Sequence, residues 1–194
     1  MGPCILLAMT RVAWQAGVTL AELTMVLAIL AILAVFAMPA GLDWWRRETV
    51  IVLADRFASA ASLARATARN RRIWVHLGPR EAASGWSAGW ALYTTATPRT
   101  WAARTAPDTD DVLIAVSPPV VPSIDFAFIS SQKGVDTISY APVGYSRTSN
   151  GAPLSGTLTI ASGAHVRRVR INFAGRVRVC NPATDRSCGT GDDS

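Results

Sequence analysis

The densest group of charged side chains in this chain lies near its C-terminus, where residues 167–180 read RRVRINFAGRVRVC. The alternation of basic and apolar residues predicts two β runs that meet near Ala174 and Gly175. Because successive side chains point to opposite faces of a strand, arginines at alternate positions of each run share one face. They are Arg168 and Arg170 on the first run and Arg176 and Arg178 on the second. Two neighbouring strands would therefore display these arginines together.

Clustered guanidinium groups repel one another unless an anion lies among them, and the planar guanidinium fork suits phosphate. The whole chain favours a polyanionic ligand, since its net charge is +6 and 18 of its 19 basic residues are arginine. Arg167 adds to the local charge. Double-stranded DNA, bound through its phosphates without sequence preference, is the expected partner. The alternative is a solvated strand face in an arginine-rich protein.

No group of residues indicates catalysis, and we expect neither enzyme activity nor a bound metal or cofactor. His76 and His165 have no nearby nucleophile and no metal-ligand spacing, and no glycine-rich loop has the phosphate-cradling pattern. Cys180 and Cys188 are too far apart for a CxxC redox pair. The paired carboxylates Asp110-Asp111 are expected in a solvated loop.

A long apolar segment with a single charge marks the other end of the chain. From Val18 to Leu42, 25 residues, the only charged residue is Glu22. As a helix this segment would span about 37 Å, enough to cross a bilayer core of roughly 30 Å. A charged side chain costs roughly 2.5–3.5 kcal/mol near the centre of such a helix, so Glu22 is expected to have a partner and a function.

The order Gly17-Val18-Thr19-Leu20-Ala21-Glu22, followed by this helix, resembles a type IV prepilin, with Val18 where the family usually has Phe. The resemblance implies that a prepilin peptidase cleaves after Gly17 and that the new N-terminal residue, Val18, is methylated. It also implies that the carboxylate of Glu22 pairs with the amino terminus of an adjacent subunit in a filament. An ordinary signal anchor with a chance glutamate is the alternative.

The implied leader, residues 1–17, is unusually apolar from Cys4 to Met9. A start at Met9 would leave a more typical leader with Arg11 as its positive charge, so we expect translation to begin there. A cleaved secretory signal is disfavoured, because the apolar run is too long and no small-x-small site clearly ends it. The resemblance implies a single-pass inner-membrane protein with a periplasmic globular domain, which then enters a pilus or pseudopilus.

The helix is predicted to continue past the membrane or filament-core segment, residues 18–42, as an amphipathic segment over residues 43–72. Its apolar residues recur at helical spacing, at Val50, Leu53, Ala54, Phe57, Ala61 and Ala64. This face is expected to pack on the globular domain, residues 73–194.

Short β runs alternate with turn residues such as Gly78-Pro79 and Ser84-Gly85 beyond the helix. The predicted strands are Ile73–Leu77, Gly89–Thr94, Val112–Val116, Ile124–Ile129, Thr137–Tyr140, Thr157–Ile160, Val166–Phe173 and Arg176–Cys180. The fold class is therefore α+β, a long helix packed on an antiparallel sheet or small β-sandwich. The tryptophans near the first strands are expected in the core, with base stacking by an exposed pair as the alternative. They are Trp74, Trp86, Trp90 and Trp101.

Two further stretches resemble the GspH/FimT family of minor pilins and type II secretion pseudopilins. Residues 63–77, LARATARNRRIWVHL, are similar to the helix end and first strand of that group. Gly175-Arg176-Val177-Arg178 matches the G-R-x-R pattern of the FimT-type minor pilins, which is associated with DNA binding in natural transformation. The resemblance carries over to Gly175, Arg176 and Arg178 alone, and Arg167, Arg168 and Arg170 join them through local charge.

The oxidising compartment implied by the resemblance favours a disulfide between Cys180 and Cys188, with two free thiols as the alternative. Two functions then fit the sequence. One is a minor type IV pilin that binds DNA, assists its uptake in natural transformation, and assembles with other pilin subunits. The other is a structural subunit without DNA binding, either a pilus-priming pilin or a GspH-like pseudopilin whose basic face meets an acidic neighbour.

Overall fold

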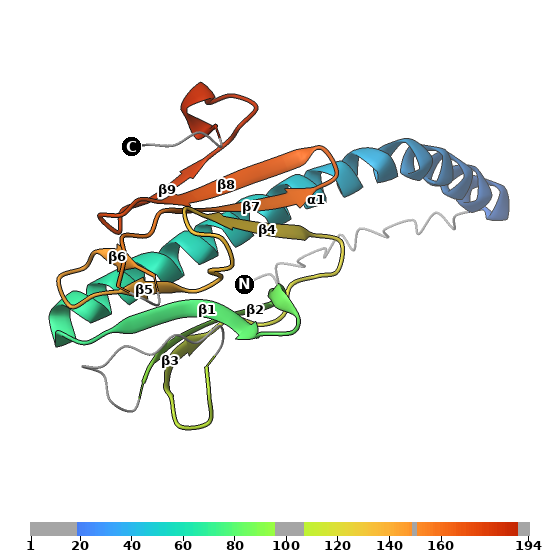
Figure 1. Ribbon diagram of the computed structural model, residues 1–194. Coiled ribbons are helices and arrows are strands. Elements are labelled where there is room, and N and C mark those ends of the chain that lie inside the picture. The colour runs from blue at the N-terminus through green and yellow to red at the C-terminus, as the bar shows by residue number, and fades with distance from the viewer. Residues whose placement is uncertain (1–18, 96–106, 149–150, 190–194) are drawn as a thin grey trace, which may run out of the picture. The chain divides into compact units, whose positions relative to one another are not determined.

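The computed structural model describes residues 19–95, 107–148 and 151–189, and Figure 1 shows how their elements are arranged. The expected leader and Val18 lie outside these residues. The chain divides into two compact units, Met1–Leu42 and Asp43–Ser194. Helix α1 (Leu20–Arg71) begins in the first unit and ends in the second, where all nine strands assigned among the described residues follow it.

The first unit contains the apolar start of α1. The hydroxyl oxygen of Thr19 accepts a hydrogen bond from the backbone N–H of Glu22 at 3.2 Å, so Thr19 caps the helix. The side chains described between Leu20 and Leu42 are exposed. Within the described residues, no single helix has the length and hydropathy of a membrane span. The bent pair Leu20–Val35 and Ala40–Arg71 meets that requirement jointly, by length and composition alone.

The part of α1 in the second unit buries the apolar face that the spacing predicted. Its buried residues are Val50, Leu53, Ala54, Phe57, Ala61, Ala64 and Ala68. The helix ends because Arg72 adopts a φ of +54°, and the N–H of Ile73 bonds to the carbonyl oxygen of Ala68 at 3.2 Å. This left-handed ending usually has glycine at the position that Arg72 occupies here.

Two antiparallel sheets share a hydrophobic core with this helix, which confirms the α+β fold (Figure 1). The first sheet has the strand order β3-β2-β1-β5-β6 and the second β4-β7-β8-β9. The strands of the first sheet are β1 (Val75–Glu81), β2 (Gly85–Thr94), β3 (Val112–Val116), β5 (Ile138–Tyr140) and β6 (Ser146–Arg147). Those of the second are β4 (Asp125–Ser130), β7 (Gly156–Ser162), β8 (His165–Ile171) and β9 (Val177–Cys180).

An aromatic cluster joins the helix to the first sheet. The ring of Phe57 meets the rings of Trp86 and Trp90 edge to face, with centroids 5.4 Å apart in both pairs. Both tryptophans are buried, so they cannot stack on a base as an exposed pair would. Trp74 is half-buried, and Trp101 lies outside the described residues.

Several strand ends are shifted, as in β2, which begins at Gly85 where Gly89 was predicted. Two further differences concern β1 and β6. Strand β1 continues through Gly78 and Pro79, which the sequence pattern indicates as a turn, and both residues pair with β2. Because β5 pairs only with residues 75–77 of β1, Pro79 lies where β1 has a single neighbour, and there a missing N–H is tolerated. Strand β6 was not predicted, since two residues carry no periodic signal.

Candidate nucleic-acid interface

The β8–β9 hairpin places three of the predicted arginines on one face of the second sheet. Arg170 and Arg178 lie directly opposite each other across the two strands. Arg168 is two residues before Arg170 and so shares its face. The neighbouring strand β7 presents Thr157 and Thr159 beside them. Arg168, Arg170 and Arg178, together with Arg176 just before β9, are called the arginine surface below.

Arg167 lies on the opposite face of the sheet. It is paired with Ile160, whose side chain is fully buried in the core. Its Nη1 donates a hydrogen bond to the carbonyl oxygen of Val166 at 3.1 Å. The structure therefore separates Arg167 from the arginine surface, although it is adjacent to Arg168 in sequence.

Cys180 and Cys188 form the expected disulfide, with 5.8 Å between their Cα atoms. The segment that it closes, residues 181–188, is called the disulfide loop and folds back onto the arginine surface. Nη1 of Arg168 donates to the carbonyl oxygen of Cys188, and Nη1 of Arg170 donates to that of Ser187, both at 2.7 Å. Backbone carbonyl oxygens of the loop therefore accept hydrogen bonds from two of the guanidinium groups that were predicted to bind phosphate.

Asp185 of the same loop binds the third guanidinium group. Its Oδ2 lies 2.6 Å from Nη2 of Arg178, and its Oδ1 accepts hydrogen bonds from the hydroxyl of Ser187 at 2.7 Å and the backbone N–H of Ser187 at 3.0 Å. The hydrogen bonds from Ser187, and after them the charge of Arg178, hold the pKa of Asp185 below its ordinary value. The carboxylate is thus kept ionised beside Arg178.

The disulfide loop has a clear physical role here. Like charges directly opposite each other on two strands are destabilising, and Arg170 faces Arg178 across the hairpin. Carbonyl oxygens and one carboxylate from the loop reduce this repulsion by accepting hydrogen bonds from the guanidinium groups. Asp185 was not predicted as a partner of the arginines, although an acidic residue two positions before Ser187 in a disulfide-closed loop is a usable capping signal.

Arg176 differs from the other members of the arginine surface. Its side chain is exposed, and within the described part of the chain its guanidinium has no partner. Arg178 keeps 57% of its side chain exposed despite its ion pair. Arg186, on the disulfide loop, is also exposed. An external anion can therefore reach these three guanidinium groups without displacing the loop.

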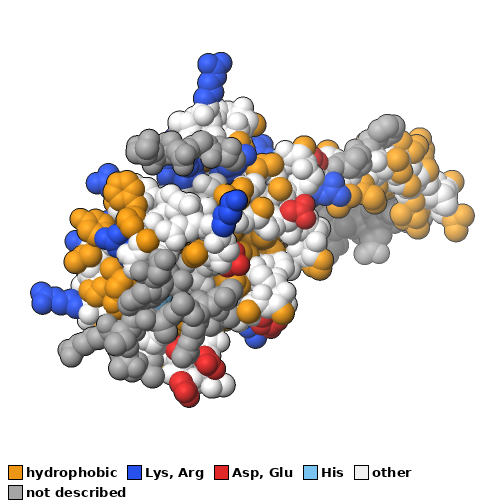
Figure 2. Space-filling view, viewed as in Figure 1, with side chains coloured by type: hydrophobic (Ala, Val, Ile, Leu, Met, Phe, Trp, Pro, Cys, Tyr) orange, Lys and Arg blue, Asp and Glu red, His pale blue; other side chains and the backbone are white. Residues whose placement is uncertain are grey.

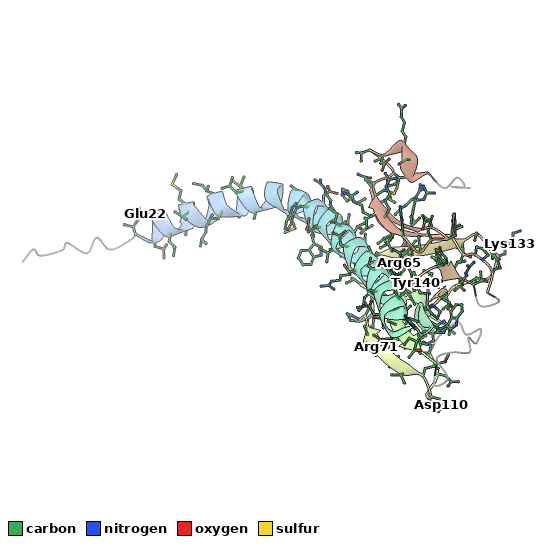
Figure 3. All side chains as sticks on the ribbon, turned by 90° about the vertical axis from the view of Figure 1, so that its left-hand side faces the viewer. Glu22, Arg65, Arg71, Asp110, Lys133 and Tyr140 are labelled. Carbon is green, nitrogen blue, oxygen red and sulfur yellow. A yellow bond between two sulfur atoms is a disulfide. The ribbon has the colours of Figure 1, made fainter. Side chains whose placement is uncertain are left out.

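Gly175 is a packing residue at the turn between β8 and β9. It is buried, with a φ of +73°, and a Cβ atom there would press against the backbone carbonyl oxygen of Gly144. It would also lie 3.2 Å from both Nε of Arg65 and the ring of Tyr140. Arg65 in turn donates from Nε to the carbonyl oxygen of Gly144 at 3.0 Å, and Figure 3 shows Arg65 and Tyr140 close together. Gly175 thus holds the turn that carries Arg176 against the helix.

Of the residues predicted to act in processing and assembly, Gly17 and Val18 lie outside the described residues. Glu22 lies in the first turn of α1 and is exposed (Figure 3). A negative charge at this position is favoured by the helix dipole.

The long helix, apolar at its start and packed through its later turns on antiparallel sheets, defines a pilin-like protein. The family model described as type II transport protein GspH matches residues 53–175, more than half of the chain, and the chain therefore belongs to the GspH family. This family and fold are those of minor pilins and pseudopilins, which are structural, non-enzymatic subunits that assemble with other pilin or pseudopilin subunits.

Among solved structures, the chain is similar to the type IV minor pilin FimU of Pseudomonas aeruginosa. One crystal structure of FimU superimposes with a TM-score of 0.51 at 12% identity, covering 71% of this chain and 92% of FimU. A second crystal form gives a TM-score of 0.49 at 13% identity, covering 67% and 91%. At this identity the likeness shows the fold. No curated protein matches the chain.

Proposed function

We propose that this chain is a minor type IV pilin that binds double-stranded DNA non-specifically and assists DNA uptake in natural transformation. The observation that carries the proposal is the exposure of Arg176 and Arg178 on the turn and edge strand of the second sheet. Arg186 of the disulfide loop is exposed as well. Phosphates of the DNA backbone would bind these guanidinium groups first. Gly175 contributes by holding the turn, and Arg167 contributes only long-range charge.

The proposed mechanism is electrostatic. Exposed guanidinium groups release counterions from the duplex when they bind its phosphates, which gives affinity without sequence preference. Arg168 and Arg170 contribute indirectly, because they raise the local positive potential while the disulfide loop accepts their hydrogen bonds. Retraction of the filament would supply the force that draws bound DNA inward.

Membership of a filament requires processing and assembly at the N-terminus. We propose that a prepilin peptidase cleaves after Gly17 on the cytoplasmic side, leaving methylated Val18 as the first residue. Residues 18–42 then anchor the subunit in the inner membrane and later in the filament core, with the globular domain in the periplasm. The carboxylate of Glu22 pairs with the amino terminus of an adjacent subunit, which removes the cost of burying it.

One observation favours a second candidate, a purely structural minor pilin or GspH-like pseudopilin. Three of the four arginines of the arginine surface bond to the chain's own disulfide loop. Under this second candidate they stabilise the C-terminal hairpin, and Arg176 contacts an acidic residue of a neighbouring subunit.

The test is a DNA mobility shift over a salt series, using the full chain in a nonionic detergent. Wild type is compared with Arg176→Ala/Arg178→Ala and with a charge-matched control, Arg56→Ala/Arg80→Ala, whose arginines are exposed elsewhere on the domain. We expect wild type and the control to bind alike. The Arg176→Ala/Arg178→Ala variant should bind weakly, with a salt slope smaller by about 2.

Two outcomes would reject the DNA-binding proposal. One is the absence of binding by wild type near physiological salt. The other is an Arg176→Ala/Arg178→Ala variant that binds DNA no more weakly than the Arg56→Ala/Arg80→Ala control, which would mean that this site does not carry the binding. In either case the structural candidate becomes the better one.

A further inference from the structure

Two turns from different sheets are joined at one end of the globular domain. The first, between β5 and β6, spans residues 141–145, and the second, between β8 and β9, spans residues 172–176. The backbone N–H of Ser146 donates to the carbonyl oxygen of Phe173 at 3.2 Å. The hydroxyl of Ser146 lies 2.8 Å from the carbonyl oxygen of Asn172 and 2.5 Å from that of Leu154, which share its one hydrogen. Close packing of Gly175 on the carbonyl of Gly144 completes the contact. The two turns therefore form one continuous, backbone-locked surface.

This surface exposes two aromatic rings. Phe173 is 55% exposed and Tyr145 is 46% exposed, with the neighbouring Val143 at 64%. The space beneath the turns is already filled, because the ring of Tyr140 lies there fully buried. The locked backbone keeps both exposed rings at the surface, although covering them with apolar material would be favourable. Figure 2 shows hydrophobic side chains interleaved with basic ones at the left-hand end of the molecule.

Arginine is the only charged residue type in either turn and the strand residues that follow. The segments 141–147 and 172–178 read APVGYSR and NFAGRVR. The guanidinium carbon of Arg147 lies 5.7 Å from the ring centroid of Tyr145, which places the cation over one face of that ring. Arg176 follows Phe173 by three residues on the same turn and belongs to the arginine surface. Each exposed ring is thus accompanied by an arginine.

We propose that Tyr145 and Phe173 form a stacking site for unpaired bases, so that this chain binds single-stranded DNA more tightly than duplex. The inference rests on the proposed function, because it extends the same DNA-binding surface around the hairpin turn. Aromatic faces bind any unpaired base by stacking, and arginines between them bind the connecting phosphates. Bases in a duplex are already stacked and paired, so duplex DNA gains only the phosphate contacts.

The site gives the protein a preference for frayed ends, gaps and single-stranded overhangs. Arg176 supports this, because it lies on the same turn as Phe173 and belongs to the arginine surface. Stacking is tolerant of base identity, so the preference concerns strandedness and carries no sequence specificity.

The test uses fluorescence anisotropy with the full chain in nonionic detergent, a 20-nucleotide oligothymidine and a duplex of the same length. We expect wild type to bind the single strand more tightly than the duplex. Phe173→Ala and Tyr145→Ala should each weaken single-strand binding by about tenfold or more, with little change for the duplex. Two controls test whether the aromatic ring is what matters. Tyr145→Phe keeps the ring and removes only the hydroxyl, and Val143→Ala removes an exposed apolar side chain that is not aromatic. Both should behave as wild type.

The outcomes of this experiment distinguish failure of the proposed DNA binding from failure of the stacking site. If wild type binds neither oligonucleotide, the proposed function itself is wrong. If it binds the duplex with the expected dependence on Arg176 and Arg178, but the aromatic variants bind the single strand as wild type does, the stacking site alone is overturned. If Phe173→Ala leaves all DNA binding unchanged and prevents incorporation into filaments, the aromatic turns are a contact between subunits, which also overturns the inference.

Discussion

The guanidinium group of Arg178 and the carboxylate of Asp185 form an ion pair with 2.6 Å between Nη2 and Oδ2. The pair joins the edge strand of the second sheet to the disulfide loop, and the same carboxylate accepts two hydrogen bonds from Ser187. A residue predicted to bind an external phosphate therefore also holds the fold of its own hairpin. The proposed binding to DNA and the stability of the loop are therefore coupled through this one side chain.

Replacement of Asp185 by Asn should destabilise the domain in a pH-dependent way. The pKa of Asp185 is lowered in the folded state, so its contribution to stability is present above the ordinary carboxyl pKa and is lost as pH falls through the folded value. We expect Asp185→Asn to lower the thermal unfolding midpoint at pH 7. The difference from wild type should shrink steadily below about pH 4. Asp136→Asn, which changes another exposed carboxylate, should not reproduce this pattern.

Alanine at Gly175 should disrupt the junction between the two turns. At Gly163 the φ of +58° also disfavours alanine, but nothing lies within 4 Å of the added Cβ atom. Gly163→Ala therefore isolates the backbone cost, about 1–2 kcal/mol. Gly175→Ala adds a clash with a backbone carbonyl, and we expect about 1–3 kcal/mol more in denaturant unfolding. Equal destabilisation in the two variants would contradict the packing role of Gly175.

Tyr140 should limit stability at alkaline pH. Burial raises the pKa of its hydroxyl above the ordinary value of 10.0, although the charge of Arg65 opposes this. The neutral phenol therefore contributes its full share to the free energy of unfolding below pH 10.0. This contribution is lost as pH rises above that value, because Tyr140 of the unfolded chain ionises before that of the folded chain. Tyr140→Phe has no hydroxyl to ionise, so its unfolding midpoint should fall less than that of wild type as pH rises above 10.0.

The same substitution tests a second property of Tyr140. Its hydroxyl is buried, and among the described residues it has no hydrogen-bond partner. At pH 7 we expect Tyr140→Phe to be neutral or to stabilise the domain by about 1 kcal/mol in chemical denaturation. Tyr145→Phe, at an exposed tyrosine, serves as the control. It should change neither the stability at pH 7 nor the loss of stability at alkaline pH. Clear destabilisation by Tyr140→Phe at neutral pH would indicate a hydrogen bond that the structure lacks.

Glu22→Ala should separate processing from assembly. The proposed cleavage after Gly17 lies upstream of the carboxylate, so the variant should be cleaved as wild type is. Under the proposed pairing, a subunit without this carboxylate cannot bind a neighbour's amino terminus, and we expect it to be absent from purified filaments. Glu48→Ala, an exposed glutamate in the later part of α1, should be incorporated normally. Normal incorporation of Glu22→Ala would reject the proposed pairing.

Local pattern predicted much of this fold because the signals are periodic. The buried face from Val50 to Ala64 follows helical spacing, and the alternation in β8 places Val169 and Ile171 in the core with Arg168 and Arg170 outside. A helix has 3.6 residues per turn, and successive side chains of a strand point to opposite faces. The positions of the apolar residues in one segment therefore show which face of that helix or strand is buried. The same alternation sets Arg167 on the core-facing side.

Tertiary contacts decided what the arginines touch. Whether a guanidinium meets solvent, a phosphate or a backbone carbonyl depends on segments that approach from elsewhere in the chain. The carbonyl oxygens of Ser187 and Cys188 reach Arg170 and Arg168 only because the disulfide loop folds back. Such a contact leaves no periodic trace in the sequence.

The sequence by itself determined the helix, most of the strands and the alternating arginines, whereas it left the disulfide open against two free thiols. Only the tertiary structure revealed that Gly175 packs on Gly144 and that Phe173 and Tyr145, 28 residues apart, lie on joined turns. The physical reason is that burial of a periodic face is a local property of one segment. The meeting of two turns depends on the register of two sheets and on close approaches that only the folded backbone defines.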